Sequence, residues 1–463
     1  MISDAAVSGI KLAYIGGGSR EWAYKLMIDL ALEGSLSGTV QLYDIDRGAA
    51  LENEKMGNGL TARADVPGKW AYHVADSLAE ALEGADFVII SILPGTFAEM
   101  ASDVHAPEKY GIYQSVGDTT GPGGLVRALR AIPMYVEFAQ ALQKYSPDAW
   151  VINYTNPMAL CVRTLYEVFP GIKAFGCCHE VFGTQELLAA MLAELEGIAG
   201  VARDEIKVDV LGINHFTWIS QASYHGTDLF PLYRRFVDRH FQEGFRIPGD
   251  AGWTESVFHS AHRVKFDLFR RYGSIAAAGD RHLAEFMPPW YLKDPETVAS
   301  WKFRLTPVDY RIERRKEIDK FRQRVVAGEE ILDLKPSGEE GVRQIAALLG
   351  LGDLVTNVNL PNRGQIQGLP SGAVVETNAL FRRDEIRPIL AGGLPSEING
   401  LVARHVLNQE TVLRAALDKD PDLAFLAFLN DPLVTIGPDS ARELFYAMLR
   451  NTRAYLPGWP IPA

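Results

Sequence analysis

The stretch at residues 11–19 reads KLAYIGGGS, a short apolar run that stops at three consecutive glycines. A helical pattern follows over residues 20–33, and a second apolar segment, TVQLY at residues 39–43, ends at Asp44. A strand, a glycine turn and a helix in this order are typical of a dinucleotide-binding unit, because glycine lets the backbone approach a pyrophosphate at the helix N-terminus. Asp44 is placed to hydrogen-bond a ribose hydroxyl, which favours NAD over NADP.

The glycine loop departs from the usual fingerprint in two respects. The third glycine of the pattern would fall where this chain has Glu21, and Asp44 lies further from Gly16 than the roughly 20 residues that are usual. A purely structural glycine turn is therefore the alternative. Because the loop stands between a strand and a helix, we predict that Gly16, Gly18, Ser19 and Asp44 contact the cofactor.

Apolar segments continue to alternate with helical ones up to about residue 200. They predict buried strands at residues 86–92, 149–153 and 173–177. Such an alternation predicts an α/β fold with a doubly wound parallel sheet of the Rossmann type, similar to lactate and malate dehydrogenases. Later segments read as paired strands and long helices. We therefore predict an NAD-binding domain over residues 1–200 and a C-terminal α+β domain, for substrate binding or oligomerisation, over residues 201–463.

Composition and charge exclude several classes of function. The 463 residues include 46 basic and 58 acidic side chains, a net charge of −12, which is a poor match for nucleic acid or an anionic membrane. No apolar run approaches the roughly 18 residues that a membrane helix needs, and the N-terminus shows no secretory leader. The three cysteines, two of them adjacent, form no disulfide framework and predict a reducing cytoplasm.

Polar residues recur where the predicted strands end. Ligands of doubly wound sheets bind beyond the carboxyl ends of the strands, so these residues are candidates for the site. The candidates are Pro94 and Asn153, which we assign to the cofactor, then Asn156, Cys178, His179 and His215, and also Asp118, which precedes a glycine-rich turn into a helix. Cys178 and His215 could together bind a metal ion and leave coordination positions for substrate oxygens. Each could instead be an ordinary buried residue.

A charge-rich segment, RIERRKEIDKFRQRV at residues 311–325, predicts a long helix. Its charges pair at i,i+4 spacing, which is typical of a solvated helix face. We favour that interpretation over an anion-binding site.

The motifs, taken together, resemble glycoside hydrolase family 4. They run in order from residue 11 to about 376 and are GGGS with LYDID, SILPG, VGDTTGPGG, NYTNP, GCCHEV, LGINHF, GDRHLAEF and NRGQIQGLPSGAVVE. The resemblance implies NAD and a divalent metal, typically manganese. It implies oxidation at C3 of the sugar, removal of the C2 proton, elimination of the C1–O bond, addition of water and return of the hydride.

The resemblance also implies roles for single residues. Cys178 and His215 would be the metal ligands, with zinc or iron as competitors for the thiolate. Asn156 would hold substrate hydroxyls and Asp118 would lie near the nucleotide or the sugar.

The base that removes the C2 proton is less closely defined by the family pattern. Asp280 aligns best with it and Tyr272 is the reserve, although Asp280 could also be a turn residue. His179 could assist the leaving group or be structural.

The CHEV motif that begins at Cys178 is similar to the α-galacturonidase subgroup of the family. A uronate needs a cation for its C6 carboxylate, and Arg281, His282 and Arg363 are the candidates. The resemblance therefore implies an α-galacturonidase acting on a small uronide, with α-glucuronidase and α-galactosidase as alternatives. An NAD-dependent 2-hydroxy acid dehydrogenase and a non-catalytic NAD sensor are alternatives from other classes. Family and size imply a homodimer or homotetramer.

Overall fold

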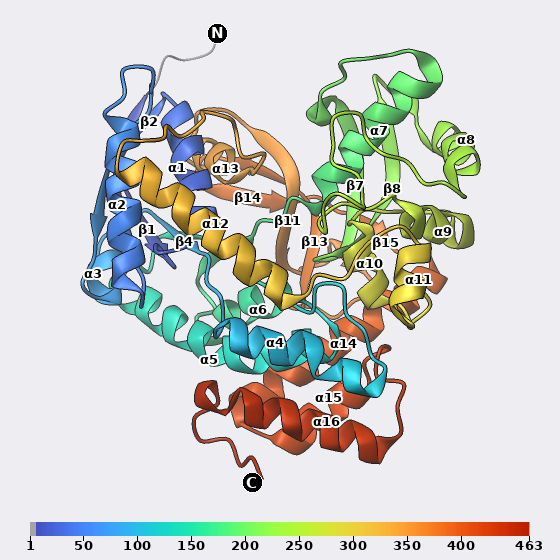
Figure 1. Ribbon diagram of the computed structural model, residues 1–463. Coiled ribbons are helices and arrows are strands. Elements are labelled where there is room, and N and C mark those ends of the chain that lie inside the picture. Colours follow the sequence, from blue (N-terminus) through green and yellow to red (C-terminus); the bar gives the residue numbers. More distant parts are fainter. Residues whose placement is uncertain (1–5, 463) are drawn as a thin grey trace.

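The fold is built on one sheet of 13 strands, seen in a computed structural model that describes residues 6–462 (Figure 1). Its parallel part has the strand order β3-β2-β1-β4-β5-β6. The bounds are β1 Val7–Ile15, β2 Leu36–Tyr43, β3 Lys69–Val74, β4 Phe87–Ile90, β5 Trp150–Asn153 and β6 Lys173–Gly176. This is the order of dinucleotide-binding folds, with the switch point between β1 and β4. The predicted doubly wound sheet is confirmed.

Helices connect the parallel strands and cover the sheet. They are α1 (Trp22–Leu32), α2 (Arg47–Thr61), α3 (Leu78–Leu82), α4 (Phe97–His105), α5 (Gly121–Tyr145) and α6 (Met158–Val168). The strand β4 is buried at all four positions, as its apolar sequence requires. It ends at Ile90, two residues earlier than predicted, because the chain turns at Pro94-Gly95.

Residues beyond 200 extend the same sheet with antiparallel strands. These are β7 (Ile206–Ile213), β8 (Phe216–Tyr224), β9 (Thr227–Asp228), β10 (Ile275–Ala276), β11 (Leu354–Pro361), β13 (Val374–Arg382) and β14 (Glu385–Pro388). β11 joins β6 with Asn359 opposite Gly176, so the sheet runs without a break across the predicted domain boundary. The division at residue 200 stays a prediction.

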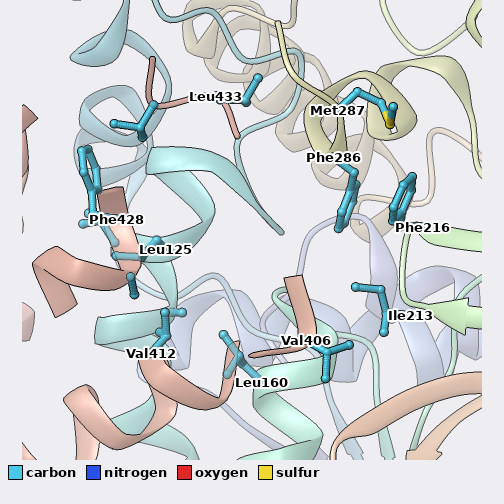
Figure 2. Close-up of a cluster of buried hydrophobic side chains, with 14 of the residues drawn as sticks. Leu125, Leu160, Ile213, Phe216, Phe286, Met287, Val406, Val412, Phe428 and Leu433 are labelled. Atoms are coloured by element: carbon cyan, nitrogen blue, oxygen red, sulfur yellow. The ribbon is translucent and has the colours of Figure 1, made fainter. Parts of the chain in front are cut away.

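The largest hydrophobic cluster fixes the position of two segments that bear histidines (Figure 2). Phe216, the first residue of β8, stacks on Phe286, the last residue of α10 (Asp280–Phe286), with ring centroids 4.8 Å apart. Helices α5 and α14 (Ser396–Asp418) contribute Leu125 and Val406 to the same cluster. Because His215 precedes Phe216 and His282 lies one turn before Phe286, this packing brings the two imidazoles together.

The charged segment forms helix α12 (Val308–Val326), which packs against α2 and α4 and crosses in front of β1 and β4 in Figure 1. The predicted helix is confirmed, but the solvated-face interpretation is wrong for part of it. Arg322 is fully buried and donates to Asn53 Oδ1 at 2.9 Å. Tertiary packing, which the charge pairs do not reveal, therefore places α12 over the nucleotide loop.

Two sequence-level expectations concern cysteines and membranes. All three cysteines are free and buried. None of the helices within residues 6–462 is long and apolar enough to cross a membrane.

Candidate active site

The glycine loop after β1 is held by close backbone contacts. Gly16 has φ +91°, and a Cβ there would lie 2.1 Å from the carbonyl oxygen of Ser91, so only glycine fits. The Gly18 N–H donates to Asp44 Oδ2 at 2.8 Å, and Ser19 Oγ accepts from the Trp22 N–H at 3.2 Å. The loop thus stands at the switch point, at the start of α1, as a nucleotide site requires.

Two residues assigned to the cofactor are engaged with the protein itself. The carbonyl oxygen of Pro94 accepts from Arg130 Nε at 2.8 Å. Asn153 is fully buried, and its Oδ1 accepts from the Tyr135 hydroxyl and from the Thr155 N–H. Asn153 therefore shapes the turn after β5, and its contact with the cofactor stays a prediction.

Three potential metal ligands converge beyond the carboxyl ends of the strands. One ligand atom each from Asp118, His215 and His282 lies within 4.8 Å of the others. The two imidazole rings have centroids 3.7 Å apart. His215 stands in the two-residue turn between β7 and β8, where its backbone adopts the left-handed φ of +66°. Strain of this kind persists where the surrounding packing enforces it, often at functional sites.

A chain of hydrogen bonds sets the tautomer of His215. The Thr119 hydroxyl donates to Asp118 Oδ1 at 2.7 Å and lies 2.9 Å from His215 Nδ1. A hydroxyl that donates to the carboxylate must accept from the imidazole, so we assign the proton of neutral His215 to Nδ1. The Nε2 lone pair is then free for a cation, the usual arrangement of a metal-binding histidine.

Electrostatics in the group favour neutral imidazoles and an ionised carboxylate. Burial, with His282 second, lowers the pKa of His215 to about 3, and burial also lowers the pKa of His282. Burial alone would raise the pKa of Asp118, but His282 and Arg127 hold it well below its usual value. This is the protonation state that metal binding needs.

Further polar atoms around the group have no partner within the protein. Asn156 donates to Asp118 Oδ2 at 3.4 Å, whereas its Oδ1 is buried without a hydrogen bond in residues 6–462. The same holds for Asn214 Oδ1 and His282 Nδ1. Buried polar groups are normally paired, so these atoms fit a site completed by an ion and a hydroxylated ligand.

Cys178, the predicted metal ligand, is not part of this group of three within the described chain. It belongs to a small buried cluster with Met158 and Val162. Burial, followed by the charges of Glu376 and Glu180, raises the pKa of its thiol well above the usual value. The role of Cys178 as a metal ligand stays a prediction, and a thiolate there would need the ion itself to stabilise it.

Sequence reasoning missed Glu180, which follows the CH pair of the CHEV motif. Its Oε2 accepts from the Gly279 N–H at 2.7 Å, at the start of α10, and its Oε1 lies 3.6 Å from His282 Nε2. Burial opposes ionisation, but the neighbouring imidazoles, His282 first, lower the pKa of Glu180 to about 2. The carboxylate therefore stays ionised beside the ring of His282, in the place that acidic partners of metal-binding histidines take.

The two candidates for the C2 base lie at opposite ends of α9 (Arg263–Tyr272). Asp280 accepts from the N–H groups of Val264 and Lys265 at 3.2 and 3.0 Å, and burial raises its pKa to about 6. Tyr272 packs on Trp218 in the hydrophobic cluster, about 13.5 Å along the helix from its first residue. Asp280 is the nearer to His282 in the chain, and its role as base stays a prediction.

Three further candidates occupy different surroundings. His179 is half-exposed and bonds Glu339 at 2.8 Å, an interaction that raises its pKa although burial opposes it. Arg281 is buried beside the loop that carries Asp118. Arg363 is exposed and follows β11, whose antiparallel register carries the chain toward the amino end of β6. The structure therefore does not bring Arg363 to the group of three in this chain.

Fold and site together define a Rossmann-type α/β protein with a candidate cation site at its ligand-binding edge. The model described as family 4 glycosyl hydrolase matches residues 11–194, and that of the family 4 glycosyl hydrolase C-terminal domain matches residues 210–434. The chain therefore belongs to family 4 of the glycosyl hydrolases, as the motifs predict.

Similar proteins agree with this placement. An α-galacturonidase from Thermoanaerobacterium saccharolyticum is 64% identical over 462 residues, which span 100% of this chain and 99% of the relative. The crystal structure of lplD from Bacillus subtilis is 55% identical, with a TM-score of 0.92 over 96% of this chain and 100% of that chain. A 6-phospho-α-glucosidase from gut microorganisms, solved with NAD and Mn²⁺, shares the fold at 20% identity, with a TM-score of 0.80 over 97% and 99% of the two chains.

Proposed function

We propose that this chain is an α-galacturonidase that requires NAD and a divalent metal ion, with Mn²⁺ the first candidate. One observation carries the proposal: the group of Asp118, His215 and His282 stands at the carboxyl edge of the sheet that also presents the glycine loop. The 64% identical α-galacturonidase supports the choice of substrate.

The residues present fit both groups. Asp118, His215 and His282 would hold the ion, and a carboxylate with two imidazoles suits manganese, iron or zinc. Gly16 and Gly18 would let the loop approach the pyrophosphate, and Asp44 would bind a ribose hydroxyl. When bound, NAD would supply reversible oxidation at C3 of the sugar and the ion would polarise the C2 and C3 oxygens.

The protein's own residues would position the sugar and move its proton. The free Oδ1 of Asn156 can accept a hydrogen bond from a sugar hydroxyl next to Asp118. Thr119 would hold His215 in its metal-binding orientation, and the Glu180 carboxylate lies 3.6 Å from His282 Nε2. Asp280, with a pKa of about 6, is suited to accept the C2 proton near neutral pH.

A panel of aryl α- and β-linked galacturonides, glucuronides and galactosides tests the proposal, each assayed with NAD, Mn²⁺ and a reductant. We expect the α-galacturonide to be cleaved fastest, with no accumulation of NADH, and EDTA to abolish the reaction. Cleavage confined to galactosides would contradict the uronate assignment. One NADH formed per turnover of a 2-hydroxy acid would instead support a dehydrogenase.

We also propose a cytoplasmic, homo-oligomeric protein, a homodimer or a homotetramer. The three reduced, buried cysteines support the compartment. Large apolar side chains exposed on the C-terminal part, Leu390, Leu407 and Leu426, support contact with a second copy.

A further inference from the structure

Arg281 of α10 and the start of α12, which carries Arg311, meet at Phe258, whose ring contacts both the Arg281 guanidinium and the ring of Tyr310. Arg281 of α10 is 8% exposed, and Arg311 of α12 is half-buried. The Nε of each is buried and has no hydrogen-bond partner within residues 6–462. Arg314, one turn after Arg311 on α12, also lies over Phe258, with its guanidinium carbon 5.3 Å from the ring centroid, so the face of α12 that carries Arg311 is turned toward Arg281.

The Arg281 guanidinium is held in place through Nη2, which bonds neutral oxygens. Its Nη2 donates to the Ser115 carbonyl oxygen at 3.3 Å and to the Thr306 hydroxyl. Its guanidinium carbon lies 5.3 Å from the ring centroid of Phe258. Ser115 belongs to the loop that leads to Asp118, so Arg281 is held next to the cation group while its Nε–H stays unused.

The two fully buried arginines of the described residues, Arg130 and Arg322, have carboxylate partners. Arg130 is fully buried and bonds both oxygens of Asp103, through Nη1 at 3.0 Å and through Nη2. Two neighbouring guanidinium groups with unpaired buried donors are unfavourable, because like charges repel in a low dielectric and unpaired donors lose their water. A carboxylate between Arg281 and Arg311 would relieve both effects.

We propose that Arg281 and Arg311 together bind the C6 carboxylate of the sugar, so that α12 supplies half of the clamp that selects uronates. This inference rests on the proposed function and adds a residue from the charged segment to it. The same helix contacts the nucleotide loop, where Arg20 Nε lies 2.9 Å from Asp319 Oδ1. Helix α12 thus connects the loop that would bind NAD with the clamp.

The test compares Arg311→Met and Arg311→Lys with Lys316→Met, a control on the exposed side of α12. With an aryl α-galacturonide, saturating NAD and Mn²⁺, we expect Arg311→Met to raise KM about 10- to 100-fold, the size of a lost charge-assisted contact, with a smaller change in kcat. Arg311→Lys should recover part of that loss, because it keeps the charge. Lys316→Met should match the parent. The increase in Tm caused by NAD should be the same in all four proteins.

Calorimetric titration with D-galacturonate and D-galactose separates the clamp from the proposed reaction, because it needs no turnover. A parent that prefers galacturonate, together with an Arg311→Met variant that has lost this preference, supports the clamp even if no glycoside is cleaved. An Arg311→Met variant that binds galacturonate as tightly as the parent overturns the clamp and leaves the proposed function standing. A loss of NAD-induced stabilisation in both Arg311 variants would show a structural role and overturn it too.

Discussion

His215→Gly is expected to lower kcat/KM for the α-galacturonide by at least about 1,000-fold. The substitution removes one of three converging ligands, and a metal that polarises the reacting oxygens supplies several kcal/mol, where about 1.4 kcal/mol corresponds to tenfold. Glycine is chosen because His215 has a φ of +66°, which glycine adopts without strain. Activity and the Mn²⁺-induced increase in Tm are the measurements.

His225→Gly is the matched control for this experiment. His225 also has a positive φ, +48°, and its side chain is 72% exposed, away from the group of three. We expect its activity and its response to Mn²⁺ to equal those of the parent. A His215→Gly variant that keeps Mn²⁺-dependent activity within tenfold of the parent would remove His215 from the metal site.

Gly16→Ala is expected to destabilise the protein by about 2–6 kcal/mol, since a strained φ and an overpacked contact each cost about 1–3 kcal/mol. The new Cβ would lie 2.1 Å from the Ser91 carbonyl oxygen, which is part of the backbone and cannot turn aside. Displacement of the loop should also abolish the increase in Tm that NAD gives the parent. Thermal unfolding with and without NAD measures both effects.

Gly59→Ala is the matched control, because its expected effect on stability has the opposite sign. Gly59 lies within α2, and a Cβ there meets nothing within 4 Å. Replacement by alanine should leave stability unchanged or raise it by up to about 1 kcal/mol. If Gly16→Ala were as stable as Gly59→Ala and bound NAD equally well, close backbone contacts at Gly16 would not hold the loop in place.

The sequence predicted the parts of the site that depend on local pattern. Asn156 and His215 follow strands and Asp118 precedes a glycine-rich turn, and the structure places them at the predicted edge of the sheet. The sequence also predicted the glycine loop and Asp44, because a turn that only glycine can adopt and the end of a strand are both local properties.

The rest of the site depends on packing between distant segments. His282, assigned to the substrate carboxylate, reaches His215 only because Phe286 stacks on Phe216. Arg363 lies away from this group because β11 runs antiparallel to β6, which a sequence does not reveal, and its role stays a prediction. Arg322 was taken for a solvated charge, since nothing local indicates which elements α12 covers.

The exchange of hydrogen at C2 of the sugar tests the central claim most directly. The α-galacturonide is hydrolysed in D₂O with NAD and Mn²⁺, and the galacturonate is analysed by NMR and mass spectrometry. If the redox coenzyme and the metal act on one bound sugar, the product carries deuterium at C2 and total NAD stays constant. A product with only protium at C2, formed at the full rate, would contradict the account.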